Sequence, residues 1–299
     1  MDLFAGSRGK GIILTMLSAF FFGASPLLVP FTYELGGNPE TVNFFRSFFA
    51  ALILLVILVV RKVPLSLGLR TIKDIALVGV FGGGLTTLLL YNSYSYIGIG
   101  TATTLHFVYP VFVCLICRIF FKEQLGIRRI VVLLIASIGI VCFFEPEQVQ
   151  GGTGLVLAVV SGITYALYMV GMEKRGLDQL NSYLVTFYIG IFVALFLLLY
   201  SLPSGAIRVD LPMQAYVYMF VLAVATSFLG VMLLQMGIKY LGATTASIFC
   251  LFEPITSIIS GGIFLDETLT WLKALGCGLI FLSVILLAME KEKTPKSAK

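Results

Sequence analysis

The chain has 299 residues, of which 59% are hydrophobic and 12% are charged, and its mean hydropathy is +1.03. A soluble domain carries about twice that charged fraction because its surface faces water, so the composition indicates an integral membrane protein whose surface faces lipid. The net charge of +5 does not indicate a nucleic-acid partner, because the basic residues stand in short clusters between apolar runs, as membrane loops require.

Ten apolar runs have a length, roughly 20 residues, that suits a membrane-spanning helix. The first run follows Arg8 and Lys10 as a secretory signal would, but it is long enough to span, and we interpret it as an uncleaved helix. Short connections rich in Gly, Pro, Asn and charge separate the runs, and we expect the polar tail 290–299 to be disordered. The predicted spans are residues 11–31, 41–60, 74–94, 101–121, 128–144, 154–172, 182–200, 215–237, 243–264 and 272–289.

The lysine and arginine residues predict the orientation. With the N-terminus in the cytoplasm, sixteen of them fall in inside segments, only Arg208 and Lys273 fall outside, and Arg46 and Arg118 fall within spans. Cytoplasmic loops are enriched in these residues. We therefore predict that both termini are cytoplasmic.

The second half of the chain repeats the first at a shift of 144 residues. Residues 96–102 (YIGIGTA) align with 240–246 (YLGATTA), and Pro110 aligns with Pro254. Each half would hold five spans, an odd number, so the second half would enter the membrane with the opposite polarity. Such inverted repeats are typical of secondary transporters. The predicted fold is all-α, with ten transmembrane helices in two inverted five-helix repeats, residues 11–144 and 154–289.

Several short motifs resemble the EamA family of the drug/metabolite transporter superfamily. The second half carries the pattern best, in 251–254 (LFEP) and 264–269 (FLDETL), and the first half has a weaker copy in 108–110 (VYP) and 121–125 (FKEQL). Segment 43–46 (NFFR) is similar to the part of the second span in which the family carries an arginine. The resemblance implies a carrier of metabolites, often amino acids, in the inner or plasma membrane, with a central cavity between the two halves.

Polar groups inside the spans are the candidate site residues, because a charge at the bilayer centre costs roughly 2.5–3.5 kcal/mol. Glu253 lies ten residues into its span, and it either binds a cationic group or a coupling proton, or sets helix packing. Tyr109 occupies the equivalent position in the first half and shares a helix face with His106. We expect both to face the central cavity, where His106 either orients solute or moves a proton, or else makes an interhelical hydrogen bond.

The other candidates also have two interpretations each. Arg46 either binds a carboxylate or phosphate of the solute, or extends to the interface or pairs with a structural carboxylate. Pro110 and Pro254 either bend gating helices or form static kinks. Tyr165, which shares a helix face with a second tyrosine, is either an aromatic cavity wall or core. Asn92 and Gln235 are weaker candidates for contact with solute.

The predicted function is a secondary transporter that exports a small metabolite, an amino acid or a related polar organic solute, across the inner or plasma membrane by alternating access. The alternative is a membrane receptor or assembly subunit without transport activity. An enzyme is not expected, because one His, one mid-span Glu and no mid-span Asp do not form a catalytic set. No nucleotide-binding motif, metal site or cofactor is expected. The expected partners are a small-molecule solute, membrane lipid and a coupling proton.

Overall fold

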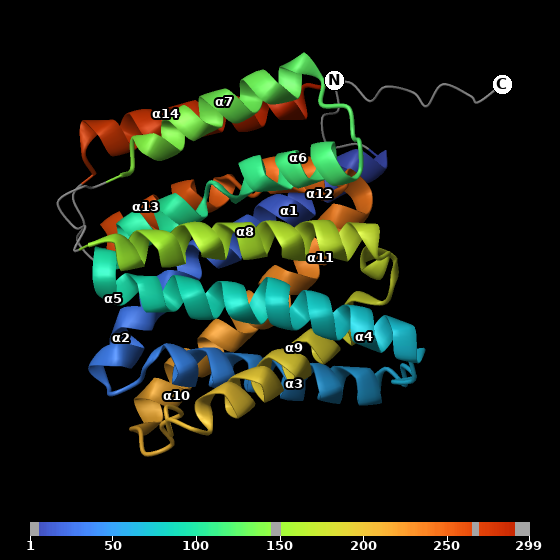
Figure 1. The fold of residues 1–299 in the computed structure, drawn as a ribbon, viewed down its shortest axis with the longest axis vertical. Coiled ribbons are helices and arrows are strands. Elements are labelled where there is room, and N and C mark those ends of the chain that lie inside the picture. The colour runs from blue at the N-terminus through green and yellow to red at the C-terminus, as the bar shows by residue number, and fades with distance from the viewer. Residues whose placement is uncertain (1–5, 145–150, 265–268, 291–299) are drawn as a thin grey trace.

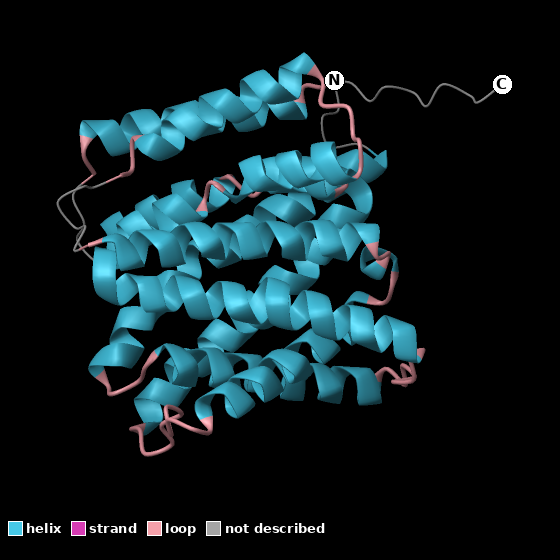
Figure 2. Ribbon diagram, in the orientation of Figure 1, coloured by secondary structure: helices cyan, strands magenta, loops and turns pink. Residues whose placement is uncertain are grey.

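The structure, a computed structural model, describes residues 6–144, 151–264 and 269–290 (Figure 1). Every regular element in these residues is a helix (Figure 2). Eight helical segments are long and apolar enough to cross a membrane, and the helix Tyr109–Phe120 is apolar but shorter. The prediction of an all-α membrane fold is confirmed, whereas the count of ten spans stays a prediction. The predicted disordered tail lies outside the described residues from 291 onward.

The two halves of the chain run from α1 to α7 and from α8 to α14. The first half contains α1 (Gly6–Ala24), the 3-10 turn η1 (Ser25–Leu27), α2 (Leu28–Glu34), α3 (Pro39–Val60), α4 (Leu69–Leu77), the π-helical segment η2 (Val78–Gly84), α5 (Leu85–His106), α6 (Tyr109–Phe120) and α7 (Ile127–Val141). The second half contains α8 (Gly152–Lys174), the 3-10 turn η4 (Leu177–Gln179), α9 (Ser182–Ser201), α10 (Met213–Leu222), the π-helical segment η5 (Ala223–Gly230), α11 (Val231–Leu241), α12 (Ala243–Phe249), α13 (Phe252–Phe264) and α14 (Trp271–Ala288).

Side-chain caps fix where several of these helices begin. The Asn38 side chain accepts a hydrogen bond from the Thr41 amide at the start of α3, and Asn181 does the same for the first turn of α9. The Thr270 hydroxyl accepts from the Lys273 amide at the start of α14. Such caps satisfy amide groups that have no partner within the helix.

The backbone repeats at the same shift as the sequence. Gly98 (φ 70°, ψ 163°) and its counterpart Gly242 (φ 74°, ψ 160°) interrupt their helices in the same conformation, one that is essentially restricted to glycine. The π-helical segments η2 and η5 also lie in equivalent parts of the two halves. Gly98 therefore divides the 38-residue apolar stretch Leu69–His106, at a point between the predicted third and fourth spans.

The helices lie side by side, with α7 and α14 at one edge of the molecule and α3, α9 and α10 at the other (Figure 1). Glycines allow close approach between neighbours: a Cβ on Gly139 of α7 would lie 2.9 Å from the Gly276 carbonyl oxygen of α14. The Arg8 guanidinium donates a hydrogen bond of 3.0 Å to the Leu287 carbonyl. The start of α1 and the end of α14 therefore lie at the same side of the molecule.

Candidate functional site

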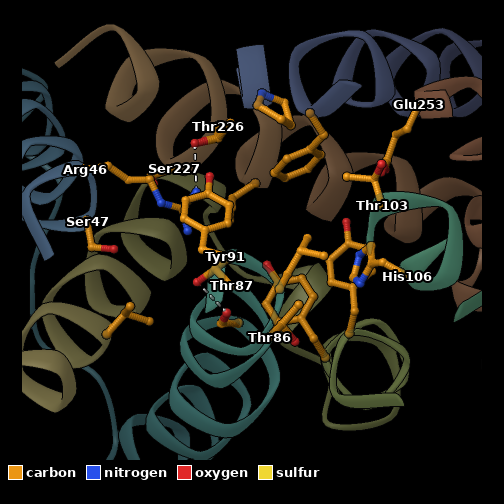
Figure 3. A pocket seen from close by; sticks show the side chains of 18 of the residues that line it. Arg46, Ser47, Thr86, Thr87, Tyr91, Thr103, His106, Thr226, Ser227 and Glu253 are labelled. Carbon is orange, nitrogen blue, oxygen red and sulfur yellow. Dashed lines mark hydrogen bonds between the residues drawn. The ribbon is translucent and has the colours of Figure 1, made fainter. Parts of the chain in front are cut away.

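A central cavity lies between the two halves and is lined by residues of both (Figure 3). About 120 Å³ of it is open to the centres of water molecules. Four predicted site residues line it, namely Arg46, His106, Tyr165 and Glu253. The fold thus brings a cation and a carboxyl group from distant segments to one cavity.

Arg46 of α3 is buried, with 6% of its surface exposed. Its Nη1 donates to Thr226 Oγ1 at 2.9 Å, its Nε donates to Asn43 Oδ1 at 3.3 Å, and its guanidinium lies 5.6 Å from the centre of the Tyr91 ring. Among the residues that the structure describes, no carboxylate forms an ion pair with Arg46. The side chain is thus held inside the protein by neutral groups rather than by an opposite charge.

Glu253 of α13 is also buried, with 4% of its surface exposed. The Tyr109 hydroxyl donates to Glu253 Oε1 at 3.3 Å, and no cation within the described ranges is paired with this carboxyl group. Tyr109 itself is fully buried and does not line the cavity, because the Tyr165 ring packs edge-on against it at 4.7 Å. Tyr109 therefore contacts the cavity-lining residues Glu253, Tyr165 and His106 from behind the cavity wall.

His106 is the last residue of α5, and its side chain makes an interhelical hydrogen bond, which was one of the two roles considered for it. Its Nδ1 lies 2.9 Å from Ser161 Oγ, and the Ser161 hydroxyl donates to the Ala158 carbonyl at 2.6 Å. The single hydroxyl hydrogen is then used within α8, so His106 Nδ1 must be the donor to Ser161. A neutral ring in this tautomer keeps Nε2 as an acceptor.

Stacked tyrosines form part of the cavity wall. Tyr165 and Tyr168 lie with ring centres 5.9 Å apart and planes at 3°. Their hydroxyl groups, and that of Tyr94, are buried without a hydrogen-bond partner in the described part of the chain. Since buried polar groups normally have partners, these hydroxyls are available to water or to a solute.

The helix breaks lie just before the two prolines. α5 and α6 are separated at residues 107–108, and α12 and α13 at 250–251. A proline is tolerated in the first turn of a helix, where its missing amide hydrogen is not needed. Pro110 therefore leaves the His106 carbonyl without its helical donor, and Gly162 of α8 packs so close that a Cβ there would lie 3.0 Å from that oxygen.

Both halves of the chain match the EamA-like transporter family, at residues 9–144 and 152–289. The chain belongs to this family. It is therefore a multi-pass membrane protein and a transporter of small solutes.

Related proteins agree with the family assignment. YcbK, an uncharacterised transporter of Bacillus subtilis, is 25% identical over 301 residues, which cover 96% of this chain and 95% of YcbK. An uncharacterised transporter of Archaeoglobus fulgidus is 24% identical over 285 residues, which cover 94% of this chain and all of that protein. The biotin transporter of Escherichia coli K12 is 28% identical over 186 residues, covering 60% of this chain and 61% of that one.

A solved crystal structure superposes on this EamA-like transporter with a TM-score of 0.78 and 14% identity. The superposition covers 94% of this chain and 98% of the other. It shows that the two proteins share a fold.

Two weaker sequence candidates lie away from the central cavity. Asn92 donates to the Leu88 carbonyl of its own helix at 2.8 Å, and the buried Gln235 donates to the Leu177 carbonyl at 2.8 Å. Neither residue lines the cavity of the transporter. The structure gives both of them backbone partners instead.

The sequence analysis missed several lining residues. Thr86, Leu90 and Tyr94 recur at every fourth position of α5, so they share one face, and all three line the cavity. The spacing of Thr86 and Tyr94 on one face of an apolar span was a usable signal. Thr226, the partner of Arg46, gave no comparable signal, because only the packing of η5 against α3 brings the two together.

A smaller second cavity of the transporter adjoins the central one. About 60 Å³ of it is open to water centres, and its wall includes Pro254 and Lys273, the latter near the start of α14. The two cavities share Pro26, Thr103, Phe107 and Ser257.

A charged cluster joins the two halves of the transporter at the ends of α6 and α8 and the start of α12. Lys174 Nζ donates to Glu123 Oε1 at 2.5 Å and to Glu173 Oε1 at 2.7 Å. The Thr244 hydroxyl donates to Glu123 Oε2 at 2.9 Å, and Glu173 also accepts from the Ala243 amide. Burial acts to raise the pKa of the Glu123 carboxyl, but hydrogen bonds from Lys174 and Thr244 lower it below its ordinary value of 4.5.

Proposed function

We propose that this protein is a secondary transporter that exports an amino acid or a related small polar organic solute across the plasma membrane by alternating access. The observation that carries the proposal is the central cavity, which is lined by residues of both halves of the repeated chain. Inverted repeats around one site allow the same scaffold to open to either side. The sequence carries no nucleotide-binding motif, so the driving force would be a solute or ion gradient.

The contacts on the two sides of the cavity support alternating access. On one side, the second cavity continues the first towards Lys273, which the predicted orientation places outside. On the other side, the cluster of Glu123, Glu173 and Lys174 ties the halves together, and that orientation places it in the cytoplasm. In this proposal the helix breaks before Pro110 and Pro254 are the points at which α5–α6 and α12–α13 bend when the closed side opens.

Glu253 is the proposed proton site. An ionised carboxylate that is buried without a cation is costly, and Glu253 has only the Tyr109 hydroxyl as a side-chain partner among the described residues. The site therefore favours a bound proton or a cationic group of the solute. Protonation and deprotonation of Glu253 would couple a proton gradient to the transport cycle.

The experiment is counterflow into proteoliposomes that contain the purified protein. Amino acids and small organic acids and amines are scanned as solutes, at pH 6 and pH 8. We expect solute-specific exchange that depends on pH, and we expect Glu253→Gln to lose that pH dependence. Asp210→Asn, a change at an exposed loop residue, is the matched control and should behave as the unaltered protein.

Two results would contradict the proposal. If a solute binds the purified protein with micromolar affinity and never exchanges, the receptor or assembly-subunit alternative is favoured. If Glu253→Gln exchanges solute with an unchanged pH profile, Glu253 is not the coupling site.

A further inference from the structure

We infer that Arg46 binds the carboxylate group of the solute and that the stacked rings of Tyr165 and Tyr168 hold its apolar body, so that the transported class is organic carboxylates with an apolar body. This inference rests on the proposed function and names its substrate class.

The first argument is the unpaired charge of Arg46. Arg46 is more than nine-tenths buried and lines the cavity, and the side-chain partners of its guanidinium are the neutral groups of Asn43, Thr226 and Tyr91. A buried cation normally pairs with an anion, yet none is present in the described ranges. Nη2 makes no hydrogen bond to the residues in those ranges, and a guanidinium matches the two oxygens of a carboxylate. An anionic solute would complete this site.

The second argument is the character of the remaining wall. Tyr165 and Tyr168, whose rings are parallel to within 3°, both line the cavity with aromatic rings, and their buried hydroxyls lack partners within the described part of the chain. Ligand sites combine such apolar walls with a few polar groups that fix orientation. The wall therefore suits an apolar body that carries little charge.

The third argument concerns the positions of the two charged residues, Arg46 and Glu253, which do not suit the simultaneous binding of the carboxylate and ammonium groups of one amino acid. Figure 3 shows Arg46 with Thr226 at one side of the cavity, and Glu253 with Thr103 and His106 at the opposite side. In an α-amino acid the ammonium and carboxylate groups are attached to the same carbon atom. When the carboxylate contacts Arg46, the ammonium group therefore lies beside it, on the Arg46 side of the cavity. Glu253 thus stays available for a proton while Arg46 selects the anion.

The test is direct binding to the purified protein in detergent, measured by isothermal titration. The probes are 3-phenylpropionate, phenethylamine and propionate, which vary the charged group and the apolar body separately. We expect 3-phenylpropionate to bind at least tenfold more tightly than either of the other two. We expect Arg46→Gln to weaken its binding at least tenfold, since a hydrogen-bonded charge pair is commonly worth a tenfold change or more.

Two further variants control this experiment. Arg118→Gln removes a charge from an exposed position at the end of α6, and we expect it to bind as the unaltered protein does. Arg46→Lys keeps the charge but not the fork of donors, and we expect intermediate affinity. If Arg46→Gln does not fold, as judged by its melting temperature and gel filtration, the Lys variant and the comparison of probes decide the question.

The outcomes separate the inference from the proposed function. Binding of 3-phenylpropionate that depends on Arg46, without any exchange in proteoliposomes, would overturn the transporter proposal and leave the inference standing. The inference would be overturned, and the transporter proposal kept, by two results together. These are that Arg46→Gln still exchanges another solute, and that phenethylamine binds at least as tightly as 3-phenylpropionate. Equal binding of all three probes would also overturn the inference.

Discussion

The contact between α1 and α13 beside the cavity gives a prediction whose size follows from the structure. A Cβ added at Gly23 would lie 1.9 Å from Thr256 Oγ1 and 2.3 Å from the Glu253 carbonyl oxygen. The carbonyl belongs to the backbone and cannot rotate away, so Gly23→Ala must push the two helices apart. Overpacking of this kind costs about 1–3 kcal/mol. The separation also lengthens the 3.4 Å hydrogen bond from the Thr256 hydroxyl of α13 to the Ala19 carbonyl of α1, and such a bond is worth about 0.5–1.5 kcal/mol.

The combined loss, about 1.5–4.5 kcal/mol, is large enough to measure. At roughly 2–4 °C for each kcal/mol in a chain of this size, we expect the melting temperature of purified Gly23→Ala in detergent to fall by about 3–18 °C. Gly278→Ala is the matched control, because no heavy atom lies within 4 Å of a Cβ there and both residues are helical glycines. If Gly23→Ala melts within about a degree of Gly278→Ala, the described contact between α1 and α13 is wrong.

Three further predictions concern the site and the charged cluster. The folded-state pKa of Glu123 is lowered, so its ionised carboxylate stabilises the fold above about pH 4.5, and this contribution is lost as the pH falls further. The contribution is under about 1 kcal/mol, because the group is partly exposed. Between pH 7 and pH 3.5 the melting temperature of Glu123→Gln should therefore fall less than that of the unaltered protein, and an equal fall would contradict this prediction. Ser161→Ala leaves buried His106 Nδ1 without its partner and should lower the free energy of unfolding by about 1–3 kcal/mol. The control in the same melting assay is Ser137→Ala, which loses only a hydrogen bond within its own helix. Equal effects of the two substitutions would refute the prediction. Pro254→Ala restores an amide donor and should slow counterflow without weakening solute binding, so unchanged exchange would argue for a static kink.

The class of protein and its internal repeat could be predicted from the sequence because both are properties of linear order. Composition alone indicated a lipid-facing surface, and the 144-residue shift aligned Gly98 with Gly242 before either backbone conformation was known. The structure confirms that shift in the matched dihedral angles of the two glycines. The proline positions likewise indicated interruptions in the helices, and the breaks at 107–108 and 250–251 lie there because proline cannot donate to the preceding turn.

The choice of side chains that meet in the cavity was decided by tertiary structure. In a soluble helix an apolar stripe marks the buried face, but in a membrane the lipid-facing and protein-facing sides are both apolar, so the pattern does not say which face meets which neighbour. The sequence therefore selected Asn92 and Gln235, which bind backbone carbonyls, alongside Arg46 and Glu253, which line the cavity. Only the packing of α3 against η5 could pair Arg46 with Thr226.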